Sequence, residues 1–177
     1  MSDISQASIN PETFKSGFVT LIGRPSSGKS TLLNALMGKK LAIASPTAQT
    51  TRHRFRAVHT TDTHQMIIVD TPGVHKPHDT LGEELNTTAL KSLDGIDVVA
   101  FLLDSSAPFG KGDEWIIEQL KSFNMPKVLV LSKIDLVTPE QLEEQRFKAV
   151  SAGDWSDVVE LSSTTGQNLD LFSSTIE

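Results

Sequence analysis

The chain has 177 residues, of which 38% are hydrophobic and 21% are charged, and this length suits one compact domain with a buried core. It has no cysteine, which excludes disulfide scaffolds, thiolate metal sites and cysteine nucleophiles. The net charge of −6 makes it unfavourable for the chain to bind a nucleic-acid backbone by electrostatic attraction alone. Residues 1–56 nevertheless carry eight basic and two acidic side chains. Either a negatively charged ligand or partner binds this first third of the chain, or the cluster is a chance group of solvated charges.

The first 16 residues are polar and lack the basic start and apolar stretch of a secretory signal. We expect a flexible tail over 1–16 and one domain over 17–177. The longest apolar run, Val98–Leu103, is far shorter than the ~20 residues of a membrane span. The sequence therefore predicts a cytoplasmic protein.

Short apolar runs alternate with helix-like stretches along the chain. In chain order we expect a buried strand at 18–23, a helix at 30–37, an edge strand at 55–60, a buried strand at 66–70, a helix at 80–93, a buried strand at 96–104, a helix at 113–122, a buried strand at 127–132, a helix at 139–151 and a buried strand at 157–161. This alternation predicts an α/β fold with a six-stranded, mostly parallel sheet and helices on both faces. Ligands of such sheets bind beyond the carboxyl ends of the strands.

Residues 23–30, GRPSSGKS, fit the phosphate-loop pattern G-x-x-x-x-G-K-[ST] and lie between a predicted strand and a predicted helix. The loop N–H groups and the helix N-terminus would cradle phosphates, Lys29 would bridge the terminal phosphates, and the Ser30 hydroxyl would bind Mg²⁺. The alternative is a glycine-rich turn with an unrelated lysine, which the strand–loop–helix context disfavours. The predicted nucleotide contacts here are Ser26, Ser27, Gly28, Lys29, Ser30 and Thr31.

Two further strand ends carry polar motifs. Asp70-Thr71-Pro72-Gly73 follows the strand at 66–70, where Asp70 would hold Mg²⁺ through its water shell and Gly73 would offer a backbone N–H to the last phosphate. Alone this motif is only a strand-ending turn, but it gains weight from following a phosphate loop.

The segment SKID at 132–135 resembles the guanine-reading N/T-K-x-D pattern. The Asp135 carboxylate can accept hydrogen bonds from N1–H and the 2-amino group of guanine, a donor pair that adenine lacks. The Lys133 stem can lie over the base. After the last predicted strand, the loop Ser162-Ser163-Thr164 can give a backbone N–H to guanine O6, although such residues are also common in ordinary turns. The predicted guanine contacts are Ser132, Lys133, Asp135, Ser162, Ser163 and Thr164.

With these elements in order, the sequence resembles Ras-like P-loop GTPases, and among them the bacterial Era GTPases, from about Phe18 to Phe172. The most specific segments are GRPSSGKSTLLNALMG, SPTAQTTRHR at 45–54 and DTPGVHKP at 70–77. The resemblance implies a three-layer P-loop fold with switch segments at 38–54 and 71–80. It implies that Thr51, or less favourably Thr50, reaches Mg²⁺ when GTP is bound. Lys29, Thr51 and Gly73 are then the expected catalytic residues, and Ser30, Thr51 and Asp70 the metal ligands.

The resemblance implies a monomeric switch that binds GTP and GDP and hydrolyses GTP with Mg²⁺. It also implies ribosome biogenesis through small-subunit ribosomal RNA and the pre-30S particle, and it suggests peripheral membrane association. Era proteins carry an RNA-binding KH domain after the GTPase domain, so we expect residues 17–177 to be a GTPase domain whose last helix is truncated. The alternatives are a P-loop small-molecule kinase and a nucleotide-sensing module with negligible turnover.

Three residues depart from common GTPase patterns. Val74 stands where many relatives place a water-orienting Gln, so we expect slow intrinsic hydrolysis. Ser26 replaces an Asn that helps to bind K⁺ in related GTPases, so we do not expect K⁺ stimulation. Ser132 replaces the usual Asn, which removes a hydrogen bond worth ~1 kcal/mol, or about fivefold in affinity.

Overall fold

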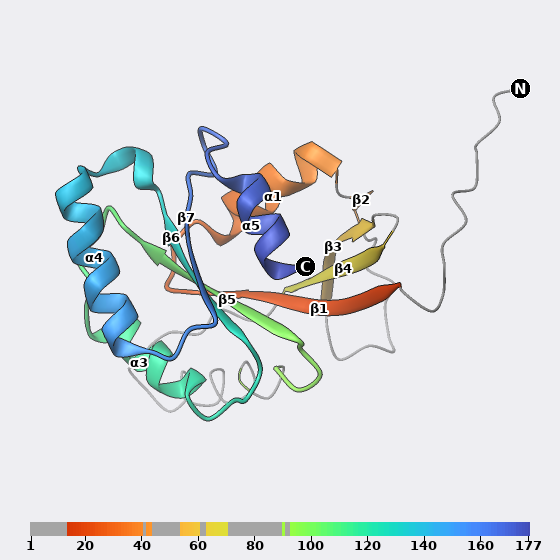
Figure 1. Ribbon diagram of the computed structural model, residues 1–177, viewed down its shortest axis with the longest axis horizontal. Coiled ribbons are helices and arrows are strands. Elements are labelled where there is room, and N and C mark those ends of the chain that lie inside the picture. The colour runs from red at the N-terminus through yellow and green to blue at the C-terminus, as the bar shows by residue number, and fades with distance from the viewer. Residues whose placement is uncertain (1–13, 41, 44–53, 61–62, 71–89, 91–92) are drawn as a thin grey trace, which may run out of the picture.

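The computed structural model describes residues 14–40, 42–43, 54–60, 63–70, 90 and 93–177, with the backbone alone at 39–40, 42–43, 54–56 and 70. Its elements in chain order are β1 (Lys15–Ile22), α1 (Lys29–Lys40), β2 (Ala42–Ile43), β3 (Arg54–Thr60), β4 (His64–Asp70), β5 (Val98–Asp104), α3 (Lys111–Leu120), β6 (Lys127–Ser132), the 3₁₀ turn η1 (Ile134–Leu136), α4 (Pro139–Ala152), β7 (Asp157–Glu160) and α5 (Leu169–Ile176) (Figure 1). None of these helices has the length and apolar character of a membrane span.

The strands form one sheet in the order β2-β3-β4-β1-β5-β6-β7. All pairs from β4 to β7 are parallel, whereas β2 and β3 run antiparallel to their neighbours. The expected α/β class and mostly parallel sheet are confirmed. The sheet has seven described strands rather than six, because the two-residue β2 pairs with Ala57 and Val58 of β3. The strand predicted at 55–60 is confirmed as β3, but its predicted position at the sheet edge is wrong, since β2 pairs with the middle of β3.

Helices cover both faces of the sheet, which gives the three expected layers (Figure 1). One buried cluster joins α1 and α5 to the sheet through residues such as Leu32, Leu36 and Phe172. The other joins α3 and α4 to the opposite face through residues such as Ile116 and Ala149. Because both faces are covered, β5 and β6 are buried along nearly their whole lengths, as their continuous apolar runs predicted.

The helix boundaries follow from local capping. Thr138 caps α4 by accepting a hydrogen bond from Gln141 N at 3.3 Å, and Pro139 occupies the first helical position, as the sequence predicted. Helix α3 begins two residues earlier than expected, because the Asp113 carboxylate reaches back to accept from Gly110 N at 3.1 Å. Of the helix expected at 80–93, only Leu90 and Leu93 lie among the described residues.

Candidate nucleotide-binding site

The loop between β1 and α1 has the backbone shape that the phosphate-loop motif requires. A side chain at Gly23 would collide with the Leu102 carbonyl oxygen and the Ser27 hydroxyl, so the loop can leave β1 only with glycine at this position. Ser26 and Gly28 take positive φ angles of 66° and 99°. Within the loop, Ser27 N donates to the Arg24 carbonyl at 3.2 Å. The chain therefore turns tightly and enters α1 directly at Lys29.

Lys29 lies across this loop rather than pointing away from it. Its Nζ donates to the carbonyl oxygens of Gly23 and Arg24, both at 2.7 Å, and to Ser27 Oγ at 3.3 Å. Ser30 and Thr31 follow in the first turn of α1 and are exposed. A fixed ammonium beside the open N-terminus of a helix is an arrangement that attracts phosphate oxygens.

Asp70 is the last residue of β4, and this strand pairs in parallel with β1 through Val69 and Thr20. The carboxyl ends of β1 and β4 are therefore neighbours, which places the Asp70 backbone near the start of the phosphate loop. The side chain of Asp70 is not described. Thr51 and Gly73, the other residues predicted for catalysis and metal binding, lie outside the described residues.

The Ser132 side chain connects the predicted guanine-reading loop to the phosphate loop. Its buried hydroxyl lies 2.7 Å from the Ser27 carbonyl oxygen and 3.0 Å from the Leu103 carbonyl oxygen, and its single proton is shared between them. Ser27 and Ser132 are separated by 105 residues in the sequence. The serine that replaces the usual asparagine thus still braces the two loops against each other.

Lys133 is held by an acidic residue, Asp104, that is not among the predicted site residues. Its Nζ lies 2.6 Å from Asp104 Oδ2, and the two side chains are 32% and 20% exposed. Asp104 Oδ1 accepts hydrogen bonds from Ser106 N at 2.9 Å and from Ser106 Oγ at 2.5 Å. Burial raises the pKa of Asp104, but the hydrogen bonds from Lys133 and Ser106 and the lysine charge outweigh it and leave the pKa lowered.

A sequence signal for Asp104 does exist. Like Asp70, it is an acidic residue at the carboxyl end of a strand, and the other residues of β5 are all apolar. The β5–β6 register then places Asp104 level with Ser132, one residue before Lys133. Lys133 itself adopts a left-handed backbone with φ 59° and ψ 36°, which turns the chain sharply after β6.

Asp135 lies in η1 and is exposed, so its carboxylate is accessible to a ligand. The neighbouring Ile134 N donates to the Leu161 carbonyl at 3.4 Å, which joins this turn to the loop after β7. In that loop Ser162 is buried: its N–H donates to the Gln167 carbonyl at 3.1 Å, and its hydroxyl accepts from Thr165 N at 3.2 Å. Ser162 therefore shapes the turn, which leaves the half-buried Ser163 and the exposed Thr164 as the better sources of an N–H for a ligand.

An ion pair ties the phosphate loop to α3. Arg24 Nη1 lies 3.0 Å from Oδ2 of Asp113, whose side chain is only 2% exposed. The same oxygen accepts the Gly110 N–H at the start of α3. This contact could not be predicted from the sequence, because Arg24 and Asp113 belong to segments that only the tertiary fold brings together.

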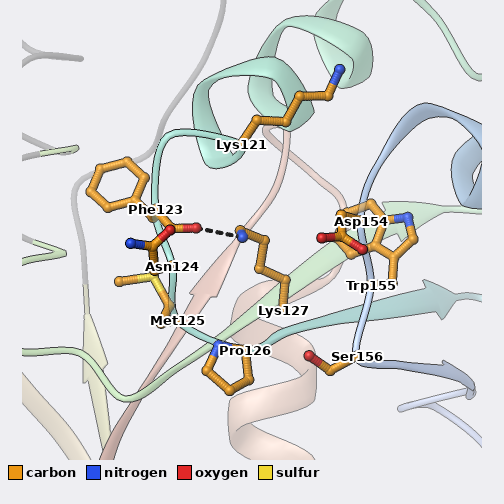
Figure 2. A pocket seen from close by; sticks show the side chains of 9 residues that line it. All are labelled: Lys121, Phe123, Asn124, Met125, Pro126, Lys127, Asp154, Trp155 and Ser156. Carbon is orange, nitrogen blue, oxygen red and sulfur yellow. Dashed lines mark hydrogen bonds between the residues drawn. The ribbon is translucent and has the colours of Figure 1, made fainter.

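A pocket among the described residues lies away from these loops. Figure 2 shows a pocket of about 410 Å³ between the end of α3 and the starts of β6 and β7, with Lys127 Nζ donating to the Phe123 carbonyl at 2.6 Å. Lys127 is the first residue of β6, and Ser156 directly precedes β7. The pocket thus opens at the amino ends of these strands, opposite the edge that carries Ser132 and Lys133.

The predicted polar residues that the structure describes therefore gather at one edge of the sheet. The phosphate loop, the end of β4 and the loops after β6 and β7 all lie at carboxyl ends of parallel strands. Ser30 carries an exposed hydroxyl, and the neighbouring strand β4 ends at Asp70. Hydroxyl and carboxylate oxygens are the kinds of donor that Mg²⁺ prefers. The arrangement suits a nucleotide whose phosphates lie at the phosphate loop and whose base lies toward Asp135.

Comparison with known proteins agrees with this geometry. The sequence model of a family described as 50S ribosome-binding GTPase matches residues 18–133. The chain is 42% identical over 178 residues to the GTPase Era of Crocosphaera subtropica, an alignment that covers 99% of this chain and 56% of that protein. It spans little more than half the length of that relative.

Two solved structures are similar at 36% identity, each covering 92% of this chain and 56% of the other chain. One is Era in complex with MgGDPNP and nucleotides 1506–1542 of 16S ribosomal RNA, with a TM-score of 0.72. The other is a point variant of Aquifex aeolicus Era bound to GDP·AlF₄⁻, with a TM-score of 0.71.

Proposed function

The chain belongs to the 50S ribosome-binding GTPase family, and on that premise we propose that it is a switch that binds GTP and GDP and hydrolyses GTP with Mg²⁺. Residues 17–177 would form its GTPase domain. The contact that supports this proposal best is the hydrogen bond from the Ser132 hydroxyl to the Ser27 carbonyl, 2.7 Å long. It holds the loop suited to phosphates against the loop suited to guanine, so that one nucleotide can contact both.

In this proposal the chemistry is in-line attack by water on the terminal phosphorus of GTP. The bond from that phosphorus to the bridging oxygen breaks, GDP leaves with the electron pair, and inorganic phosphate forms. Lys29 would neutralise charge on the phosphates from its position across the loop. Bound Mg²⁺, held by Ser30, Thr51 and Asp70, would supply further charge neutralisation. Catalysis of this kind depends mainly on positioning and electrostatic stabilisation.

Guanine selectivity would come from Asp135, and an Asp135→Asn substitution tests it directly. Guanine presents two donors to the carboxylate, whereas xanthine presents a carbonyl in place of the 2-amino group and so pairs better with an amide. We expect the variant to lose GDP affinity by about 100-fold or more and to gain affinity for xanthosine diphosphate. Glu140→Gln, an exposed acidic residue at the start of α4, is the matched control. Unchanged preference for GDP in the Asp135 variant would contradict the proposed base contact.

The same titration separates the alternatives. The wild-type chain should bind GTP and GDP and should bind ATP far more weakly. Equal competition by ATP would favour a small-molecule kinase. Single-turnover hydrolysis no faster than spontaneous GTP hydrolysis would favour a nucleotide sensor with negligible turnover.

We further propose that the whole protein assists small-subunit assembly in the cytoplasm, acting as a monomer. The Era relative solved with a 16S ribosomal RNA segment supports the small subunit, although the family description refers to the 50S subunit. The RNA contact is proposed for the KH domain that follows the GTPase domain in Era proteins. With a non-hydrolysable GTP analogue, the 177-residue chain should co-sediment more with small than with large subunits, and weakly at physiological salt. Greater retention on large subunits would favour the 50S partner instead.

A further inference from the structure

Three metal-ligand side chains meet where the β3–β4 hairpin contacts the end of α5. His59 lies near the end of β3, His64 is the first residue of β4, and Glu177 directly follows α5. His59 pairs with Met66, so His64, two residues earlier on the same strand, shares its face of the sheet. Figure 1 shows the C-terminal end of α5 beside β3 and β4.

The distances between their ligand atoms are close to those of a tetrahedral metal site. Glu177 Oε1 lies 3.1 Å from His64 Nε2 and 4.0 Å from His59 Nε2. The three ligand atoms all lie within 4.8 Å of one another. In a tetrahedral zinc site with bonds of about 2.0–2.1 Å, ligand atoms are separated by about 3.3 Å. Side-chain movements on the order of 1 Å would therefore complete three of the four positions, with water in the fourth.

The surroundings of the three side chains also favour a cation. The two histidine side chains are only 12% and 15% exposed, whereas Glu177 is an exposed residue whose side chain is 30% exposed, so the histidines are sheltered and the group is reachable from solvent on the Glu177 side. Thr63 Oγ1 lies 3.2 Å from His64 Nδ1. With a metal on Nε2, Nδ1 carries the proton and donates it to this hydroxyl, the outer-sphere support common for histidine ligands.

We infer that His59, His64 and Glu177 form a binding site for Zn²⁺ or a similar first-row divalent cation. Two imidazoles and one carboxylate suit such ions, whereas Mg²⁺ and Ca²⁺ prefer oxygen ligands alone. The ion joins the β3–β4 hairpin to the end of α5, elements that are more than a hundred residues apart in the sequence. This site is separate from the candidate nucleotide site, because both histidines flank the amino-terminal end of β4 whereas Asp70 ends that strand.

Zinc titration of the chelator-treated 177-residue protein tests this inference. Calorimetry in excess Mg²⁺, which fills sites built from oxygen ligands, should detect one zinc ion per chain. The melting temperature should rise by about 5 °C or more at 100 times the dissociation constant. Co²⁺ should give the intense visible absorption of a four-coordinate ion.

The variants assign the ligands. His64→Gln and His59→Gln should each abolish stoichiometric zinc binding, and Glu177→Gln should weaken it at least tenfold. Thr63→Val should weaken it by about 10-fold through the lost support. His75→Gln, which removes a histidine elsewhere in the sequence, is the control and should bind zinc like the wild type.

Glu177→Gln and Thr63→Val are both near-isosteric changes, so these two variants remain informative if a histidine variant fails to fold. Absence of stoichiometric binding by the wild type overturns the inference. So does zinc affinity that is unchanged in both the Glu177 and Thr63 variants. In either case the three groups form a hydrogen-bonded cluster without a metal.

Discussion

The ion pair between Lys133 and Asp104 should be measurable in both stability and nucleotide affinity. The two charged atoms are 2.6 Å apart, and the side chains are 32% and 20% exposed. Sheltered hydrogen bonds between charged groups contribute about 1.5–3 kcal/mol, and fully exposed pairs contribute about 0.2–1 kcal/mol. This pair lies between those cases, so Asp104→Asn should cost about 1–1.5 kcal/mol of unfolding free energy. If Lys133 packs over guanine, GDP affinity should fall by roughly 5- to 12-fold.

The effect should depend on pH in one direction. The folded-state pKa of Asp104 is lowered, so its charge stabilises the fold fully above the ordinary carboxyl pKa and loses that effect as the pH falls through the folded value. The difference between wild type and Asp104→Asn should therefore be constant from about pH 5 to pH 8 and should shrink below about pH 4.

Urea unfolding at pH 7 and pH 3.5, together with GDP titration at pH 7, provides the assay. Asp94→Asn is the control, because Asp94 is an exposed residue that precedes β5, at the opposite end of the strand from Asp104. A double-mutant cycle with Lys133→Ala isolates the pair. A coupling energy below about 0.3 kcal/mol at pH 7, with GDP affinity unchanged, would refute the reasoning.

Three further results are expected from the same edge of the sheet. Gly23→Ala should lower the free energy of unfolding by more than about 2 kcal/mol, because the new methyl group collides with the Leu102 carbonyl oxygen. The urea midpoint should fall accordingly, and a variant as stable as the wild type would contradict the close approach of Gly23 to Leu102. Ser132→Ala should lower the free energy of unfolding by about 1–3 kcal/mol, since the Ser27 and Leu103 carbonyl oxygens lose their shared donor. An unchanged urea midpoint would show that these hydrogen bonds do not stabilise the fold. Turnover in KCl should match that in NaCl, because Ser26 lacks the amide carbonyl of the related K⁺-stimulated enzymes; a large stimulation in KCl would contradict this.

The fold could be predicted from the sequence where burial dictates residue type. Strands covered on both faces, such as β5 and β6, must be continuously apolar, so their positions were clear from the sequence. Strand β2 has only two residues and shows no periodicity, so it was missed. The start of α3 was misplaced, since its capping contact comes from Asp113 inside the helix rather than from a residue before it.

The candidate site divides in a similar way. Motif spacing was enough to select Lys29, Ser132 and Lys133, because each motif is local in the sequence. The long-range contacts of the candidate site, such as that between Asp104 and Lys133, could not be predicted, because they depend on strand register. A shift of one residue between β5 and β6 would move Asp104 away from its position level with Ser132 and out of reach of Lys133.

The contacts found only in the structure bear on how much reorganisation a ligand would require. Lys29 is already hydrogen-bonded across the phosphate loop, Lys133 is paired with Asp104, and Ser132 holds the two loops together. Groups fixed before a ligand arrives lose little conformational freedom on binding, so more of the contact energy appears as affinity. Selectivity for guanine over other bases should then depend on these pre-positioned loops. A variant such as Ser132→Ala should consequently weaken GTP and GDP binding by similar factors, because the contacts it disturbs lie on the portion that both nucleotides share.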